Sequence, residues 1–200
     1  MSSEIRALEP KQLWNKFADL NEVPRPSKKE ERVIKFMKDF GNNLGLETLE
    51  DEVGNVIIKK SASSGMDDRK PIVMQSHLDM VHQKNNDTDF DFDTQGIDMF
   101  VEGDWVKARG TTLGADNGLG VATIMAILES DSIAHPPLEA LFTIDEETGM
   151  TGAKGLKGGL LNGEILLNLD TEEDDEIGVG CAGGVDVTAR REYKEEDTPE

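Results

Sequence analysis

Hydrophobic residues recur at helical intervals in two stretches near the start of the chain. Between Pro10 and Leu20, apolar side chains stand three or four residues apart, which predicts a helix that buries one face. Two prolines then interrupt the pattern, at positions 24 and 26. A second helix is expected from about residue 28 to residues 41–45, with Ser27 as its N-cap and Glu30 completing a capping box.

The rest of the chain alternates short apolar runs with helical patterns. The expected strands are Leu46–Leu49, Asn55–Lys59, Ile72–Ser76, Trp105–Ala108, Leu138–Ile144 and Ile165–Leu169. Gly118–Glu129 is apolar on almost every side, which is typical of a helix buried on more than one face. Gly152–Leu161 is expected to be a small glycine-rich helix or loop, and Asp87–Gly103 an irregular acidic loop. This order predicts an α/β layered fold, with a central, mostly parallel sheet flanked by helices.

The charge balance narrows the classes of partner. Lys and Arg number 21 against 41 Asp and Glu, so the formal net charge is −20. Such a chain repels phosphate backbones and anionic lipid and attracts cations, so we expect no nucleic-acid partner and no membrane partner. The single cysteine, Cys181, excludes an internal disulfide framework. Because the chain has no long apolar run and no signal-like N-terminus, a cytoplasmic protein is expected.

Three of the predicted strands run directly into residues that commonly bind metals. The strand ending at residue 76 is followed by His77 and Asp79, the strand ending at 144 by Glu146 and Glu147, and the strand ending at 169 by Asp170. A further acid, Asp116, stands just before the buried helix. In open α/β sheets the active crevice lies beyond the carboxyl ends of the strands. If these strands are parallel neighbours, the acids and the histidine converge there.

The chemistry of this set favours a divalent metal site. Carboxylates crowded together without basic partners repel one another strongly unless cations lie among them. One histidine with several carboxylates and no thiolate suits zinc, cobalt or manganese. His77 and Asp79 would share one face of a strand, so Asp79 could hydrogen-bond the imidazole and fix its tautomer. Asp116 has two carboxylate oxygens and could bridge two metals about 3.5–4 Å apart.

Neighbouring side chains diverge, so Glu146 and Glu147 can serve different purposes. One of them could bind a metal while the other faces a metal-bound water. The two remaining histidines are expected outside the site. The spacing of His82 from His77 would put the two on opposite faces of a strand, and His135 has the surroundings of a loop residue.

Four motifs, in this order, resemble those of the co-catalytic metallopeptidases. They are Ser76-His77-Leu78-Asp79-Met80-Val81, Thr112-Leu113-Gly114-Ala115-Asp116-Asn117-Gly118, Asp145-Glu146-Glu147-Thr148-Gly149 and Asn168-Leu169-Asp170-Thr171-Glu172. The chain is most similar to the aminoacyl-histidine dipeptidase (Xaa-His dipeptidase) family, along nearly its whole length. The resemblance implies a zinc-peptidase-like layered catalytic domain, here residues 1–183, and the start of an inserted α+β lid and dimerisation domain at residues 184–200.

The resemblance also implies a role for each candidate residue. His77 and Asp170 would hold one metal, Glu147 would hold the other, and Asp116 would bridge the two. Asp79 would orient His77, and Glu146 would be the general base. The cofactors would be two divalent metal ions, zinc first, with cobalt or manganese as alternatives.

The implied reaction is hydrolysis of the peptide bond of an unblocked dipeptide, of the Xaa-His type. A water activated by two metals would attack the scissile carbonyl, and the glutamate base would pass its proton to the leaving amine. The resemblance further implies a homodimer in the full-length protein, with Val185–Tyr193 as the first strand of the lid.

The chain departs from the family in length and in its histidines. Family members are more than twice as long and place a last metal-binding histidine near the C-terminus, whereas this sequence has no histidine after His135. The chain is therefore expected to correspond to an N-terminal portion, with the second metal one ligand short.

Two alternatives stay open. One is a different amide hydrolase on the same scaffold, such as an aminopeptidase, a carboxypeptidase or an N-acyl amino-acid deacylase. The other is an acidic metal-binding module without catalysis. Identifying the bound metal would separate the second alternative, such as a calcium-loaded structural domain, from an enzyme. Calcium prefers about six to eight oxygen ligands and would not need His77.

Overall fold

Five strands form the central sheet of this computed structural model, which describes residues 3–171, 175–180, 183–185 and 187–194. Their spatial order is β1 (Glu47–Glu50), β2 (Val56–Lys60), β6 (Leu138–Thr143), β3 (Ile72–His77) and β7 (Ile165–Asn168). β3 pairs in parallel with both β6 and β7, whereas β2 runs antiparallel to β1 and to β6. Four of the five strands therefore run in one direction, and the prediction of a mostly parallel sheet is confirmed.

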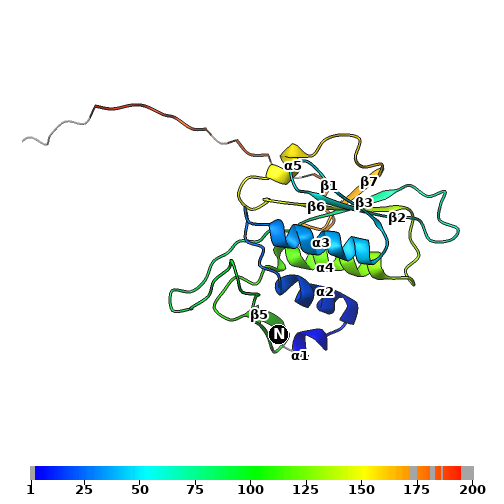
Figure 1. The fold of residues 1–200 in the computed structure, drawn as a ribbon, viewed down its shortest axis with the longest axis horizontal. Coiled ribbons are helices and arrows are strands. Elements are labelled where there is room, and N and C mark those ends of the chain that lie inside the picture. The colour runs from blue at the N-terminus through cyan, green and yellow to red at the C-terminus, as the bar shows by residue number, and fades with distance from the viewer. Residues whose placement is uncertain (1–2, 172–174, 181–182, 186, 195–200) are drawn as a thin grey trace, which may run out of the picture.

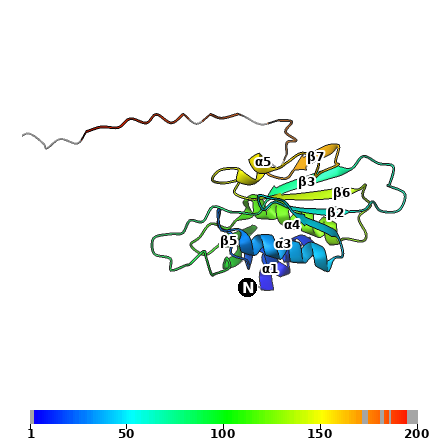
Figure 2. The ribbon, with the colours of Figure 1, turned by 45° about the horizontal axis from the view of Figure 1, so that its top comes forward.

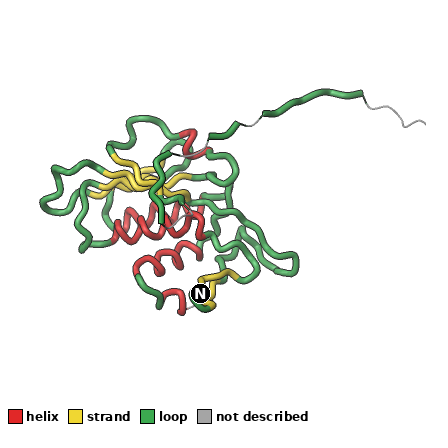
Figure 3. The backbone as a smooth tube through the Cα atoms, turned by 180° about the vertical axis from the view of Figure 1, so that it is seen from behind, coloured by secondary structure: helices red, strands yellow, loops and turns green. Residues whose placement is uncertain are grey.

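Helices cover one face of this sheet in two layers (Figures 1 and 2). α3 (Glu31–Asn43) and α4 (Ala115–Glu129) lie against the strands, and α2 (Lys11–Asn21) lies beyond α4. Farther out, α1 (Ser3–Arg6) packs beside the two-stranded sheet of β4 (Met99–Glu102) and β5 (Trp105–Ala108). Seen from behind, the long helices again lie on one side of the strands (Figure 3).

The opposite face of the sheet carries a thinner cover. α5 (Thr151–Gly155) and the segment after it lie there (Figure 1). Leu156, Leu160 and Leu161 pack against the sheet residues Ile57, Val73 and Leu141. Since both faces are covered, the central strand β6 is buried at every position, which explains why it carries the apolar residues Leu138, Ala140, Leu141 and Phe142.

α4 is apolar all round because it has neighbours on two sides. Val121, Ile124 and Met125 belong to the core shared with the sheet. Ala122 and Leu119 belong to a second cluster with Phe17 of α2. The prediction of a helix buried on more than one side is confirmed. Regular helical geometry begins at Gly118, because Asp116 and Asn117 have non-helical backbone angles.

Most predicted elements lie within one or two residues of the observed ones, and two predictions are wrong. The capping box does not form. Lys28 has a left-handed φ of 69°, the helix begins at Glu31, and the Ser27 hydroxyl donates instead to Asp79 Oδ2 at 2.8 Å. The region 87–103 is not wholly irregular either, because β4 lies within it and pairs with β5.

The predicted lid strand Val185–Tyr193 includes Asp186, which lies outside the described residues. At the described positions of this range the chain has no regular strand, and Val185, Val187 and Tyr193 are exposed. The division into residues 1–183 and 184–200 stays a prediction. Among the described residues, no helix has both the length and the apolar character needed to cross a membrane.

The buried centre of the sheet should dominate the stability of the fold. Phe142 on β6 is fully buried, and Phe142→Ala should lower the free energy of unfolding by about 3–5 kcal/mol. Trp105 on β5 is 71% exposed, so Trp105→Ala should stay within about 0.5 kcal/mol. Urea titrations of the two variants check this ranking, and equal losses would contradict the assignment of the core.

Candidate metal centre

The carboxyl ends of three parallel strands meet at one edge of the sheet. β3 ends at His77, β6 leads into the loop that carries Glu146 and Glu147, and Asp170 follows β7. α4 begins at the same edge, with Gly114 as its N-cap. Four chain segments that are far apart in sequence thus deliver their polar side chains to one place, as the strand pattern predicted.

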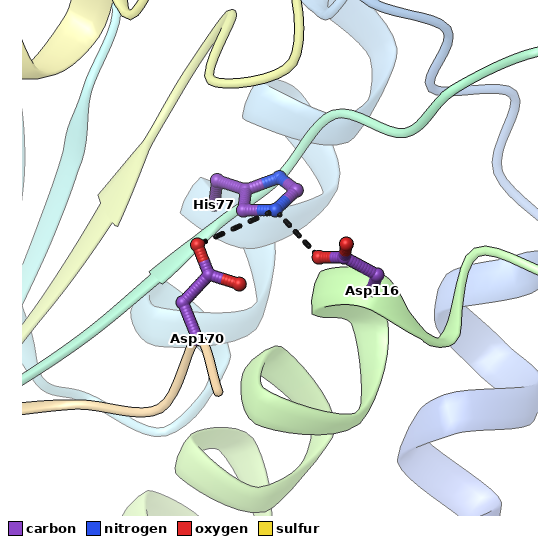
Figure 4. Close-up of side chains that lie close together, drawn as sticks. All are labelled: His77, Asp116 and Asp170. Carbon is purple, nitrogen blue, oxygen red and sulfur yellow. Dashed lines mark hydrogen bonds and ion pairs between the residues drawn. The ribbon is translucent and has the colours of Figure 1, made fainter. Parts of the chain in front are cut away.

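His77, Asp116 and Asp170 form the centre of this cluster (Figure 4). His77 Nε2 lies 3.0 Å from Asp116 Oδ1 and 3.8 Å from Asp170 Oδ2. The three side chains each offer a ligand atom, and these atoms all lie within 4.8 Å of one another. The imidazole is fully buried, whereas the Asp116 side chain is 60% exposed and open to a ligand from solvent.

Asp79 contacts the ring nitrogen of His77 that faces away from the other acids. It is fully buried, and its Oδ1 lies 3.3 Å from His77 Nδ1, so Nε2 is the ring nitrogen that faces the other acids. The Asp79 carboxylate also accepts the backbone N–H groups of Glu146, at 3.0 Å, and Glu147, at 3.3 Å. β3 ends before Asp79, so the contact predicted from a shared strand face arises in a turn. One carboxylate therefore contacts both the histidine ring and the loop after β6.

The two adjacent glutamates are half-buried and occupy different places at the rim. Glu146 Oε2 lies 4.0 Å from His77 Nε2, which puts this carboxylate beside the three central residues. The Glu147 carboxylate accepts the N–H of Val81 and interacts electrostatically with Asp116 and His77, but it is outside the closest group of three. The two carboxylates therefore diverge, and their different roles stay a prediction.

Negatively charged side chains outnumber positively charged ones in this cluster. Burial raises the pKa of Glu146, Glu147 and Asp170, and Asp116 adds to each rise by repulsion. Burial would lower the pKa of His77, but the carboxylates of Asp79, Asp170 and Asp116 outweigh it and raise that pKa to about 9. Burial would raise the pKa of Asp79, but hydrogen bonds from His77, the Glu146 N–H and Ser27 lower it to about 2. An imidazole among repelling carboxylates is the donor set that a divalent cation fits.

A family model described as "Peptidase family M20/M25/M40" matches residues 73–192, which include the six candidate site residues His77, Asp79, Asp116, Glu146, Glu147 and Asp170. The chain belongs to this family. It is 48% identical over 197 residues to the cytosol non-specific dipeptidase of Escherichia coli K12, an alignment that covers 98% of this chain and 41% of that protein. The chain thus spans less than half the length of this relative.

Solved structures of peptidases share the fold. The aminoacylhistidine dipeptidase of Vibrio alginolyticus is 49% identical, with a TM-score of 0.85 over 86% of this chain and 35% of that one. The aminopeptidase PepT of Bacillus cereus is 26% identical, with a TM-score of 0.68 over 82% of this chain and 44% of that one. The M20/M25/M40 architecture of the region is therefore established from sequence and from structure.

Several polar residues of this family member's site were not predicted. Asn117 donates to Asp170 Oδ1 at 3.0 Å and to the Leu169 carbonyl at 2.9 Å, so it fastens the segment after β7 to the start of α4. Its place beside Asp116 was the available signal, but the sequence alone suggested only a turn. Arg25 and Ser27 are both buried beside Asp79, but the sequence indicated only a helix break around Arg25 and a helix N-cap at Ser27.

A second group of acids lies beneath the loop after β6. Glu30, Asp79 and Asp145 are buried, and their carboxylate oxygens lie within 4.8 Å of one another. Each accepts hydrogen bonds from the protein: Glu30 from the Lys28 and Asp145 N–H groups, and Asp145 from Thr148 and Thr151. These bonds give the group a structural role in shaping the loop.

His82 and His135 lie away from the metal centre, as predicted. The His82 ring packs edge-on against Phe92, with centroids 5.9 Å apart. His135 Nδ1 lies 2.8 Å from the Pro136 carbonyl oxygen, and its backbone bonds to Ser63.

In the metal-free chain, His77 should make stability fall as the pH rises. Its folded pKa of about 9 exceeds the ordinary value of 6.5, so the folded state holds the proton more tightly than the unfolded state. That contribution is fully present below about pH 6.5 and is lost as the pH rises through about 9. Between about pH 6 and pH 9.5, the free energy of unfolding should drop by on the order of 3 kcal/mol more in the unchanged chain than in His77→Gln.

Urea titrations with a chelator present measure this difference. Parallel pH profiles for the two proteins would mean that His77 holds no extra proton in the folded state.

Proposed function

We propose that this protein is a metal-dependent peptidase that hydrolyses unblocked dipeptides, with Xaa-His dipeptides among its substrates. The observation that carries the proposal is the convergence of His77, Asp116 and Asp170, with Glu146 at its rim. Membership of the M20/M25/M40 family and the names of the E. coli and V. alginolyticus relatives support it. The name of the E. coli relative states a non-specific dipeptidase, which is wider than Xaa-His. The name of the V. alginolyticus relative states an aminoacylhistidine dipeptidase.

The donor set supports two divalent metals. His77, Asp116 and Asp170 would hold the first, and Asp116 would also reach the second together with Glu147. Zinc fits an imidazole with carboxylates, and cobalt or manganese accept the same ligands. Bound metals would lower the pKa of a water toward neutrality and polarise the scissile carbonyl.

The protein's own groups supply the proton transfers. Burial, and then repulsion from the neighbouring acids, raises the pKa of Glu146, which suits a general base that takes a proton from water and passes it to the leaving amine. Asp79 would keep His77 with Nε2 free for metal through its contact with Nδ1. The surplus of acidic groups around His77 favours a substrate with a free, positively charged amino terminus.

A second candidate is an aminopeptidase acting on longer peptides. The structural similarity to the B. cereus aminopeptidase PepT favours it. The two reactions are separated by comparing hydrolysis of Gly-His, β-Ala-His and a series of tripeptides by the natural full-length protein. Faster turnover of tripeptides than of every dipeptide would favour this alternative.

We further propose that the full-length protein works as a cytoplasmic homodimer.

Replacing each glutamate by glutamine should separate their roles in the full-length protein. Glu146→Gln should leave the metal content near normal and lower kcat by about 10²–10⁴-fold, the usual loss for a general base. Glu147→Gln should lower metal occupancy first, and activity as a consequence. Metal analysis beside dipeptide kinetics checks both variants, and the reverse pattern would exchange the two roles.

The 200-residue chain by itself should bind about one zinc ion tightly. Catalytic zinc takes about three protein ligands and a water. His77, Asp116 and Asp170 make one such set, whereas the second metal would have only Asp116 and Glu147 from this chain. Calorimetric titration should therefore show one tight site, and Gly-His should not be hydrolysed appreciably. Two tight zinc ions with rapid turnover would refute this ligand assignment.

A further inference from the structure

Arg25 is buried between two of the segments that carry the metal-ligand candidates. Its side chain belongs to the largest fully buried ones, and the residue is 1% exposed. Nη1 donates to the carbonyl oxygens of Leu78, at 3.0 Å, and Asp79, at 3.1 Å. Nη2 donates to Asn21 Oδ1 at 3.1 Å and to the Gly114 carbonyl at 2.6 Å. One guanidinium thus joins the turn after β3 to the start of α4.

The first pair of bonds leads to His77. The Asp79 carbonyl that accepts from Arg25 also lies 3.1 Å from His77 Nδ1. The backbone of Arg25 adds to this tie, because its carbonyl accepts the Met80 N–H at 3.1 Å. The position of the ring, and of the Nε2 atom that faces the other acids, therefore depends on a carbonyl that Arg25 holds.

The second pair of bonds leads to Asp116. Gly114 is the N-cap of α4 and has a left-handed φ of 70°, two residues before Asp116. A Cβ at Gly114 would lie 2.5 Å from Arg25 Nη2, and one at Gly118 would lie 2.7 Å from the same atom. These two glycines of the motif make room for the guanidinium, so the start of α4 is built around it.

The shape of the side chain matters as well as its charge. A guanidinium presents several N–H donors in a planar fork, so it can bond two separated backbone segments at once. A lysine ammonium is a single point and cannot reach both sets of carbonyls in the same geometry. Arg25 also places a positive charge beside Asp79, Asp116 and Glu147, all of which interact with it electrostatically.

We propose that Arg25 is a positioning residue, whose guanidinium sets the spacing between His77 and Asp116 so that both ligands face one divalent cation. This role rests on the metal-dependent function proposed above. It predicts that changes at Arg25 alter the metal site itself, beyond any general loss of stability.

Cobalt titration of the 200-residue chain tests the proposal, because cobalt binding and its visible absorption spectrum report affinity and coordination geometry without turnover. Arg25→Met removes the charge and the fork, and Arg25→Lys keeps the charge alone. Lys60→Met is the matched control. Lys60 Nζ donates to the carbonyls of Leu128, at 2.8 Å, and Ser130, at 2.6 Å, so it is also a cation that holds backbone carbonyls, but at the far end of α4.

We expect Arg25→Met and Arg25→Lys each to weaken cobalt binding by about 10–100-fold and to change the spectrum, while Lys60→Met stays within about twofold. Thermal unfolding of the three variants shows how much stability each has lost. If Arg25→Met does not fold, Arg25→Lys carries the test.

Two results would overturn the role of Arg25 and leave the proposed function intact. Affinity and spectrum unchanged in the Arg25 variants would mean that the guanidinium does not set the site. Full recovery by Arg25→Lys would mean that charge alone suffices. If the unchanged chain failed to bind cobalt, the metal-dependent function would fail and this role with it, whereas normal binding by the unchanged chain and by both variants would remove only the role of Arg25.

Discussion

The parallel pairing of β3 with both β6 and β7 decides where the chemistry of this protein lies. The register sets His77 opposite Thr143 and Gln75 opposite Asn168, so the residues that follow the three strands emerge side by side. A shift of one strand by one residue would turn that strand's side chains to the opposite face. The apolar strands and α4 hold this register, since their side chains fill the core beneath the site.

The same edge concentrates negative charge that the fold must accommodate. Burial raises the pKa of Glu146, Glu147 and Asp170, and the hydrogen bonds that the protein gives to Glu147 and Asp170 do not offset this rise. Backbone N–H groups and hydroxyls bond the deepest acids, Asp79 and Asp145, and so these act as structural anchors. The acids nearer the surface have fewer such partners, since Asp170 accepts from Asn117 and Glu147 from the Val81 N–H, and this contrast separates supporting residues from those available to a cation and a substrate.

Asp79 and Arg25 connect the supporting residues with the candidate metal ligands. Asp79 contacts His77 through its side chain and the loop after β6 through two N–H groups. Arg25 holds the Asp79 carbonyl and the start of α4. Four separate segments are thereby joined by buried, charge-assisted hydrogen bonds, which are stronger than bonds between neutral groups. Such a framework can keep repelling carboxylates in place before any ligand arrives.

The sequence by itself determined the elements and the identity of the ligand candidates. Apolar periodicity is a local property, so the strands before His77 and Asp170 and the buried helix after Asp116 could be predicted within a residue or two. The capping box at Ser27 failed for the same reason: a buried acceptor, Asp79, 52 residues away competes for its hydroxyl. The order of the strands, the bond from Asn117 to Asp170 and the position of Arg25 join residues about 50–90 positions apart. Only the tertiary structure decided these, because local spacing carries no information about which distant carbonyl or carboxylate a side chain will meet.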